Sequence, residues 1–268
     1  MAETSLERKE TMPFEDRYRI VRASAMPQGT PQIPAAIVGA GACGLTAAIR
    51  LGEAGIGSVL LERDASPGGS TALSSGFVPA AGTRLQRSLG IDDSPQLFAQ
   101  DVLDKSRGQA ARHLVQAYTA AVAQAVDALQ AHGFAFEILD GFLYPGHRAR
   151  RMHALAQRSG TALMACLERT ATELGADILT EALVCELWLD PAGKAIGLTC
   201  ERPDGTREHL GCDVLLLACN GFAGNAPMVA EWLPAIATFM LEKALTETVT
   251  ADNWFSSNPT GRYNLQAS

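Results

Sequence analysis

The sequence predicts an α/β fold with a central parallel sheet, a small antiparallel β-meander and a helical insertion. Three observations support this prediction. A strand, a glycine-rich turn, a helix and a second strand follow one another over residues 33–62, a long stretch of helical periodicity comes next, and three strands joined by tight turns lie near the end. The chain of 268 residues is 47% hydrophobic and 19% charged, so it can bury a sizeable core.

Residues 33–62 form the predicted β-α-β unit. The apolar run 35–38 enters the turn GAGACG at residues 39–44, a helix over 45–53 leaves the turn, and the apolar strand 58–61 follows. A glycine turn between a strand and a helix is typical of domains that bind dinucleotides, because the N–H groups at the helix N-terminus face the phosphates. The unit therefore predicts a Rossmann-like domain.

The glycines and one acid of this unit stand where a dinucleotide requires them. Gly39 permits the tight turn, Gly41 lets the backbone approach a pyrophosphate, and Gly44 lets the helix pack against the strand. Glu62 ends the second strand eighteen residues after Gly44, where its carboxylate can accept hydrogen bonds from a ribose diol. The alternative, a β-α-β unit without a ligand, is disfavoured by this combination.

Composition excludes several classes of function. The formal net charge is −7, from 22 basic and 29 acidic residues, which argues against a nucleic-acid-binding surface. No apolar run reaches the roughly 18 residues of a membrane-spanning helix, and the first thirty residues lack the apolar core of a signal peptide, so we expect a cytoplasmic protein. The six cysteines include no C-x-x-C pair, and we therefore expect neither a metal site nor disulfides.

The chain divides into three predicted parts. Residues 1–34 mix charges with four prolines and show no sustained period, so we expect a mobile N-terminal arm. Residues 35–234 are predicted to form the dinucleotide-binding domain, with the helical insertion at about 85–150. Residues 235–268 form an atypical C-terminal tail.

The insertion begins with two predicted helices. Ser94, followed by proline, is the expected N-cap of a helix that reaches residue 106, and a longer helix spans 109–132. Residues 134–144 alternate enough to predict a strand or hairpin that turns at Asp140-Gly141. The apolar residues of the longer helix recur at steps of three and four and are predicted to face the core: Leu114, Val115, Tyr118, Ala121, Val122, Ala125, Val126 and Leu129.

The only basic cluster of the sequence, HRARRMH, covers residues 147–153. Arginine makes bidentate hydrogen bonds to carboxylates and phosphates, so the cluster could hold an anion. The alternatives are a solvated face or ion pairs with acids elsewhere in the chain.

After a further predicted helix at 160–174, three strands form the predicted meander. They cover 177–189, 195–201 and 209–218, with tight turns between them. The last strand is apolar on both faces, as expected of a strand that returns to a covered parallel sheet, and it ends in the glycine-bearing loop 219–225.

The series GAGACG, LLERD, GGST, helical insertion, meander and LLLACNGFAGN resembles the FAD-binding half of the fumarate reductase and succinate dehydrogenase flavoprotein family, which includes 3-ketosteroid dehydrogenases. The resemblance runs from about residue 33 to 234. It implies an FAD-dependent oxidoreductase that transfers hydride between the flavin and a C–C bond beside a carboxylate or ketone. The implied substrate is a saturated or unsaturated carboxylic acid, or a ketosteroid. The GGST segment has no histidine for covalent attachment, so non-covalent FAD is implied.

The resemblance also implies roles for individual residues. At the pyrophosphate it places Gly39, Ala40, Gly41, Cys43 and Gly44. Along the phosphates and ribityl chain towards the flavin it places Gly69, Ser70, Thr71, Ser75 and Gly76. Around the adenosine it places Glu62 on the ribose, Arg63 beside it, the backbone of Val184 at the adenine, and Ala218, Cys219 and Gly221 as a cover. Facing the substrate side it places the basic cluster, with His147, Arg150, Arg151 and His153 as candidates.

The sequence departs from the family pattern in two ways. Phe77 and Asn220 stand where many members have glycine, so the local backbone is expected to differ. Nothing in residues 235–268 matches the catalytic arginine or the segment that closes over the flavin, which leaves no catalytic residue to name. A truncated, non-catalytic FAD-binding remnant or binding module is therefore the alternative function, and the apolar surface left uncovered predicts association with a partner. An NAD-dependent dehydrogenase is disfavoured by the GGST segment and the insertion.

Overall fold

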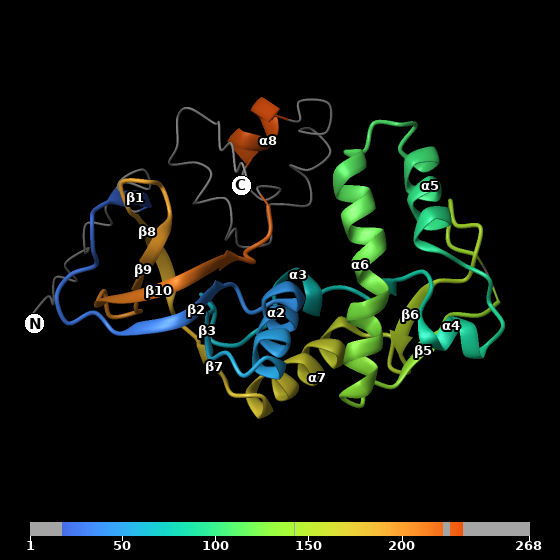
Figure 1. Cartoon of the computed structure of the whole chain (residues 1–268), viewed down its shortest axis with the longest axis horizontal. Coiled ribbons are helices and arrows are strands. Elements are labelled where there is room, and N and C mark those ends of the chain that lie inside the picture. The colour runs from blue at the N-terminus through green and yellow to red at the C-terminus, as the bar shows by residue number, and fades with distance from the viewer. Residues whose placement is uncertain (1–17, 142, 222–225, 233–268) are drawn as a thin grey trace, which may run out of the picture. The chain divides into compact units, whose positions relative to one another are not determined.

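The structure is a computed structural model that describes residues 18–141, 143–221 and 226–232 (Figure 1). The chain separates into two compact units. Unit 1 comprises the chain up to Gly39, residues 57–66, and the chain from Ile178 onwards. Unit 2 comprises Ala40–Ile56 and Pro67–Asp177.

Unit 1 is built on a sheet with the strand order β1-β8-β9-β10-β2-β3-β7 (Figure 1). Its strands are β1 Arg19–Arg22, β2 Gln32–Val38, β3 Ser58–Leu61, β7 Ala176–Leu179, β8 Leu183–Leu189, β9 Ala195–Glu201 and β10 Arg207–Leu217. Strands β10, β2 and β3 pair in parallel, whereas β8, β9 and β10 pair antiparallel. The predicted parallel sheet and the predicted meander are therefore both confirmed, and β10 belongs to both. One short helix, α8 at Ala226–Trp232, follows the last strand.

Burial decreases along β10 towards its C-terminal end. Cys212 packs in the apolar cluster of the sheet with Ala36 and Leu198, and Leu215 packs partly against it. Val214 and Leu216 lie further along the strand on the same face as Cys212, because side chains alternate, and they are 63% and 37% exposed. The prediction that both faces of this strand are covered is wrong for the part of the chain that the structure describes.

The predicted mobile arm includes a strand. Arg19–Arg22 forms β1, which pairs in parallel with β8, and Tyr18 before it is buried. Arg19 donates from Nε to Glu186 Oε1 at 2.8 Å, so an ion pair holds this strand to the meander. The prediction of an arm without structure is therefore wrong for residues 18–34, and its first 17 residues lie outside the described chain.

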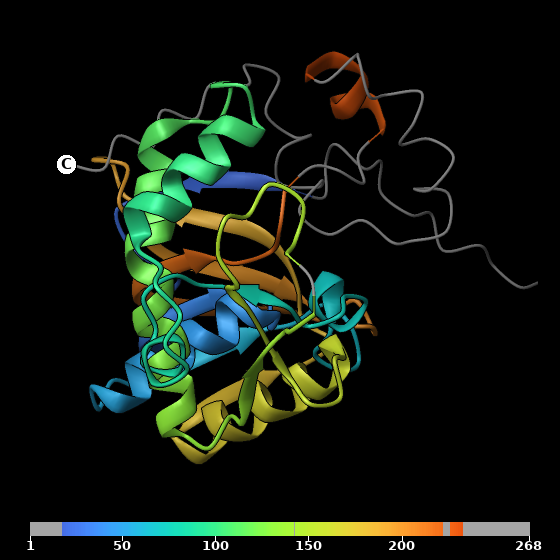
Figure 2. The ribbon, with the colours of Figure 1, turned by 90° about the vertical axis from the view of Figure 1, so that its right-hand side faces the viewer.

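Unit 2 combines six helices with a three-stranded sheet of order β4-β6-β5 among the residues that the structure describes. The helices are α2 Ala42–Glu53, α3 Gly69–Ala72, α4 Arg84–Ser88, α5 Pro95–Lys105, α6 Arg112–Ala131 and α7 Gly160–Glu173. The strands are β4 Val78–Pro79, β5 Phe136–Ile138 and β6 Met152–Leu155. Helices α5 and α6 lie side by side in both views (Figures 1 and 2). Ser94 caps α5 as predicted, because its hydroxyl accepts the N–H of Leu97 at 3.1 Å.

Two predicted strands differ in pairing or extent. Of the strand or hairpin expected over 134–144, the structure has the strand β5, which pairs antiparallel with β6. The expected continuous strand over 177–189 is interrupted between β7 and β8, where Glu181 adopts a left-handed backbone with φ 52°. That conformation breaks the extended chain, so β8 begins a new run.

The buried face of α6 is only partly the predicted one. Leu114 and Tyr118 are 62% and 45% exposed, although both were predicted to face the core. The buried residues of the helix are Val115, Thr119, Val122, Ala123, Val126 and Leu129. Thr119 and Ala123 join the buried face because they lie four residues after Val115 and Thr119, which places them on one side of the helix.

Candidate functional site

In unit 1, Gly39 lies between the ends of three parallel strands. Its N–H donates to Leu61 O at 2.8 Å, and Ala218 donates its N–H to Val38 O at 2.8 Å. The backbone of Gly39 is left-handed with φ 100°, and a Cβ there would lie 2.8 Å from Ala218 O and 3.2 Å from Cys219 Cα. Glycine is therefore required at position 39 by the fold itself. This close approach brings together the predicted pyrophosphate turn and the predicted adenosine cover.

Glu62 follows directly after β3 and is largely buried. One carboxylate oxygen accepts the N–H of Asp64 at 3.1 Å, and the backbone of Glu62 bonds to Leu179 and Ala182, at 2.9 Å each. Burial raises the pKa of Cys219. The structure thus joins the backbone of Glu62 to Ala182, just before β8.

The remaining adenosine-side residues belong to the same unit. Val184 is buried in β8 and packs in the apolar cluster of the sheet, which leaves its backbone as the part predicted to meet adenine. Arg63 is half-buried and pairs with Asp64 at 3.2 Å. Asn220 has a left-handed backbone with φ 64°, a conformation that asparagine tolerates better than most residues. Asparagine at that position therefore takes a conformation that glycine also adopts readily.

In unit 2, α2 begins directly after Gly41, its N-cap residue. Ala42, the first residue of the helix, donates its N–H to the hydroxyl of Thr71 at 3.2 Å. The backbone at Gly41 has φ −80° and ψ −173°, which any residue can adopt. A Cβ there would lie no nearer than 3.8 Å to another residue, at Thr71 Oγ1. Neither this conformation nor a contact with another part of the chain that the structure describes requires a glycine here, and the open space suits close approach of a ligand.

We call residues 69–76 the cofactor segment. It consists of the single turn α3 and a short loop that ends at Gly76, whose backbone is left-handed with φ 65°. Ser70 and Ser75 are exposed, and Thr71 ties the segment to α2 through the bond described above. Phe77, the next residue, packs against the apolar cluster of the small sheet, which accounts for the side chain at this position. The N–H groups at the start of α2 and the hydroxyl groups of the cofactor segment, both in unit 2, are hydrogen-bonding groups that suit the phosphates of a dinucleotide.

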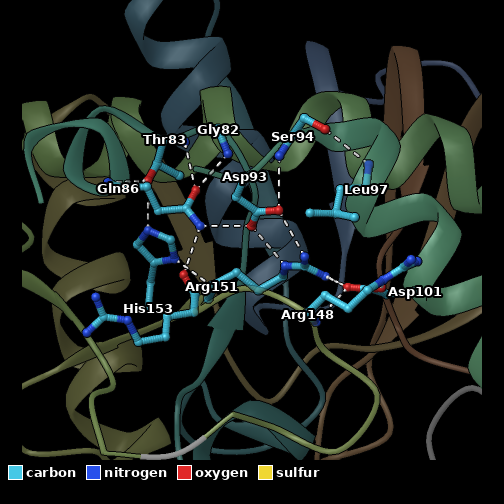
Figure 3. A network of polar contacts seen from close by, with 11 residues as sticks. Gly82, Thr83, Gln86, Asp93, Ser94, Leu97, Asp101, Arg148, Arg151 and His153 are labelled. Atoms are coloured by element: carbon cyan, nitrogen blue, oxygen red, sulfur yellow. Dashed lines mark hydrogen bonds and ion pairs between the residues drawn. The ribbon is translucent and has the colours of Figure 1, made fainter. Parts of the chain in front are cut away.

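The basic cluster is held by ion pairs within unit 2 (Figure 3). Arg151 is 0% exposed and donates from Nε and Nη2 to the two oxygens of Asp93, both at 2.9 Å, and from Nη1 to Asp101 at 2.7 Å. Its guanidinium also lies 4.6 Å from the ring centre of Phe98. A charge without water must be paired, and here two carboxylates supply the pairing. The structure therefore corrects the prediction that Arg151 faces a substrate.

His153 is also fully buried. Its Nδ1 lies 2.9 Å from Arg151 O, so this nitrogen carries the proton, and Nε2 then accepts from the hydroxyl of Thr83 at 2.9 Å. Burial lowers the pKa of His153, which keeps the ring neutral at pH 7. The prediction that His153 faces a substrate is therefore also corrected.

Gln86 completes this network and was not predicted from the sequence. Its Nε2 donates to Asp93 Oδ2 and to Arg150 O, both at 2.9 Å, and its Oε1 accepts the N–H groups of Gly82 and Thr83 (Figure 3). Thr83 and Gln86 form a capping box at the start of α4. The spacing of threonine and glutamine is a recognisable helix-start signature, so the sequence did carry a signal for α4.

The other basic side chains lie nearer the surface. Arg150 pairs with Asp140 at 2.6 Å, and Arg148 pairs with Asp101 and, at 3.2 Å, with Asp104. His147 is half-buried beside the rings of Phe98 and Tyr144, and burial lowers its pKa. Among the residues that the structure describes, no partner reaches its Nδ1. Of the two alternatives to anion binding, ion pairing with distant acids is the one observed.

The network predicts a dependence of stability on acid pH. Burial raises the pKa of Asp101, but the N–H and guanidinium of Arg148 and the guanidinium of Arg151 outweigh burial and leave it lowered. A lowered folded-state pKa contributes stability above the unfolded value of about 3.9, and that stability is lost as the pH falls through the folded value. We expect the unfolding free energy of the wild type, measured with urea, to fall below about pH 4. The unfolding free energy of Asp101→Asn should fall less steeply. The same dependence of unfolding free energy on pH in both proteins would contradict this role of Asp101.

Two kinds of feature are absent from the residues that the structure describes. No helix in that part of the chain is long and apolar enough to cross a membrane. No group of three or more histidine, cysteine, aspartate or glutamate side chains there could hold a metal ion.

Comparison with known proteins gives a consistent match. A model of the FAD binding domain family matches residues 35–252. The chain is 25% identical over 263 residues to a probable fumarate reductase of Shewanella frigidimarina, covering 91% of this chain and 44% of that protein. The structure is similar to the open form of a flavocytochrome c3 fumarate reductase, with a TM-score of 0.70 and 24% identity over 78% of this chain and 37% of that one. It is also similar to a 3-ketosteroid-Δ4-(5α)-dehydrogenase of Rhodococcus jostii, with a TM-score of 0.72 and 23% identity over 88% of this chain and 54% of that one.

These matches agree in fold and differ in extent. The solved structures confirm the α/β, Rossmann-like fold with its meander and insertion. The chain spans less than half the length of the Shewanella fumarate reductase that it matches in sequence.

Proposed function

The chain belongs to the family of FAD binding domains, and from this membership we propose that it is the cofactor-binding part of an FAD-dependent oxidoreductase of the fumarate reductase type. The observation that carries the proposal is Gly41, a glycine that the chain's own packing does not require, at the start of α2. Such a position suits close approach of a pyrophosphate to the helix N-terminus. The proposed domain covers residues 35–234.

Bound FAD supplies hydride transfer to or from one carbon of a C–C bond next to a carboxylate or ketone. The residues of this chain bind and orient the cofactor. When FAD binds, the N–H groups at the start of α2 would face the phosphates, the Glu62 carboxylate would accept from the ribose, and the cofactor segment would line the phosphates and ribityl chain. We assign no catalytic acid or base to the chain.

The proposed cofactor residues are those implied by the family resemblance. They are Gly39, Ala40, Gly41, Cys43, Gly44, Glu62, Arg63, Gly69, Ser70, Thr71, Ser75, Gly76, Val184, Ala218, Cys219 and Gly221. Non-covalent attachment is part of the proposal, because no histidine stands in the cofactor segment.

The proposed substrate is a carboxylic acid or a ketosteroid. Arg150 and His147 remain the candidates for the substrate side, since Arg151 and His153 are buried. Both Arg148 and Arg150 already pair with carboxylates of this chain. A dicarboxylate bound there must compete with Asp101 and Asp140, so this cluster favours a substrate with little negative charge.

The simplest test is the visible spectrum of the purified chain, followed by titration of the cofactor-free protein with FAD. We expect a yellow protein or stoichiometric uptake of FAD. A chain that stays colourless after FAD is added contradicts the proposal.

Glu62→Ala is expected to raise the dissociation constant for FAD by about 10- to 150-fold, because the charged acceptor contributes about 1.5–3 kcal/mol. Fluorescence quenching of added FAD measures the constant. Glu208→Ala removes an exposed glutamate of β10 and serves as the control, with unchanged affinity expected. Equal affinities of all three proteins would remove Glu62 from the site.

The alternative is a non-catalytic FAD-binding module. A steady-state assay with an artificial electron acceptor and a panel of acids and ketosteroids separates the two. Turnover by this chain excludes the module, whereas FAD binding without turnover supports it.

We further propose a cytoplasmic location, which rests on the sequence, and association through the exposed end of β10. Val214 and Leu216 are exposed on one face near the end of this strand, and Leu217 is exposed on the other. Exposed apolar surface of this kind favours association. Monomeric elution from size exclusion at high concentration would count against it.

A further inference from the structure

The cofactor segment has few side-chain anchors. No residue of α3 is buried, and Leu73, the large apolar residue that follows, is 70% exposed. An apolar side chain in solvent contributes no burial energy. Backbone carbonyls of the segment therefore matter for holding it in place, beside the hydroxyl of Thr71.

Those contacts are made with the first residues of α7. Gly160 donates its N–H to Ser74 O at 2.8 Å, and Thr161 donates its hydroxyl to Ala72 O at 3.3 Å. Ser159, the N-cap residue of α7, makes no side-chain cap bond. A carbonyl of the cofactor segment thus satisfies an N–H at this helix N-terminus that the N-cap side chain leaves open.

Two glycines allow this close packing. A Cβ on Gly160 would lie 1.8 Å from Thr71 O and 2.7 Å from Ser74 O. A Cβ on Gly76 would lie 2.8 Å from Ser159 O. Real Cβ atoms do not approach backbone oxygens so closely, so neither position accepts a side chain unless the backbone shifts.

A shift at this contact would reach the glycine turn. Thr71, whose carbonyl oxygen faces Gly160, accepts the N–H of Ala42 through its hydroxyl at 3.2 Å. Displacement of Thr71 would therefore break the bond that joins the cofactor segment to the N-terminus of α2.

We propose that Ser159–Gly160 is a seat that fixes the cofactor segment, and that Gly160 is a positioning residue for FAD. This rests on the proposed function, since it assumes that FAD lies along residues 69–76. Gly160 itself need not touch the cofactor. It acts by holding Thr71, and with it the hydroxyl and N–H groups of the segment.

Gly160→Ala tests the seat by two readouts. In the cofactor-free chain, we expect faster hydrogen exchange over residues 71–76, because the added methyl group separates Ser74 from Gly160. In FAD titrations, we expect the dissociation constant to rise by about 10- to 100-fold, and the visible circular dichroism of bound flavin to change.

Gly52→Ala is the matched control. Its Cβ would lie 2.7 Å from both Cβ and O of Leu174, at the opposite end of α7, so it introduces a backbone clash at the same helix away from the cofactor segment. We expect it to lose stability while exchange over 71–76 and FAD affinity stay close to wild type. If Gly160→Ala and Gly52→Ala both lose FAD affinity in proportion to their loss of stability, the proposal is wrong.

Ser74→Ala keeps the test decisive if Gly160→Ala fails to fold. The Ser74 hydroxyl donates to Thr71 O at 2.7 Å and accepts the N–H of Gly76 at 3.0 Å, and the residue is exposed. Faster exchange over 71–76 and weaker FAD binding are expected again. If both variants keep the hydrogen exchange and the FAD affinity of the wild type, the proposed seat is wrong. If the wild-type chain itself binds no FAD, the proposed function is wrong, but the hydrogen-exchange test of the seat still applies.

Discussion

Arg151→Met is expected to lower the free energy of unfolding by about 3–5 kcal/mol, because it leaves two buried carboxylates without their cation. The guanidinium is 0% exposed and bonds to both oxygens of Asp93 and to Asp101. Methionine has a similar length and no charge, so packing against Phe98 is largely kept and the electrostatic loss dominates. Urea unfolding followed by circular dichroism measures the change.

Arg150→Met is the matched control for this prediction. It is the same substitution one residue earlier, in an ion pair with the exposed Asp140. Surface ion pairs contribute about 0–1 kcal/mol, so the control should lose little stability. Asp93→Asn in the Arg151→Met background should recover part of the loss, since it removes one of the unpaired charges. A loss in Arg151→Met no larger than in Arg150→Met would contradict the structural role of the network.

The basic cluster shows what the sequence could not determine. Residues 147–153 are basic over a short span, which predicts a site for an anion or a set of ion pairs, and local sequence cannot choose between the two. The choice is made by Asp93 and Asp101, which lie more than forty residues earlier and reach Arg151 only after α5 has packed. The network was not predicted because its acids lie far from the basic cluster in the sequence.

Features fixed by neighbouring residues were predicted more closely. Strand β3 and strand β9 have the predicted bounds, and Ser94 caps α5 as expected. The buried face of α6 was predicted less well, because the helix is rich in alanine and two neighbouring stripes are apolar. Leu114 and Tyr118 fitted one stripe, and only the packing of unit 2 selected the other.

The same distinction applies to the candidate cofactor site. Gly39, Gly41 and Glu62 were predicted because the β-α-β unit places them at fixed intervals. Gly160 was predicted only as the start of a helix, since its contact with Thr71 joins segments almost ninety residues apart. Sequence periodicity indicates where a helix begins, but it does not reveal what packs against that end.

The second large effect is expected at Gly41, on cofactor binding rather than on stability. Gly41→Ala should raise the dissociation constant for FAD by about 10- to 100-fold, because a methyl group would occupy the space through which the backbone approaches the pyrophosphate. The unfolding free energy of the cofactor-free chain should change by no more than about 1 kcal/mol, since the backbone conformation is ordinary and the nearest atom is 3.8 Å away. FAD titration and urea unfolding of the same preparation give both quantities.

Gly39→Ala provides the contrast that makes this prediction specific. Its backbone is left-handed, and its Cβ would lie 2.8 Å from Ala218 O, so the cofactor-free chain itself should lose about 1–3 kcal/mol. Alanine is thus expected to be unfavourable at both glycines of the motif, but for different reasons. At Gly39 it destabilises the fold, and at Gly41 it weakens cofactor binding. If Gly41→Ala destabilised the cofactor-free chain as Gly39→Ala does, and left FAD affinity unchanged, Gly41 would belong to the fold, and the proposal of a bound dinucleotide would lose the observation on which it rests.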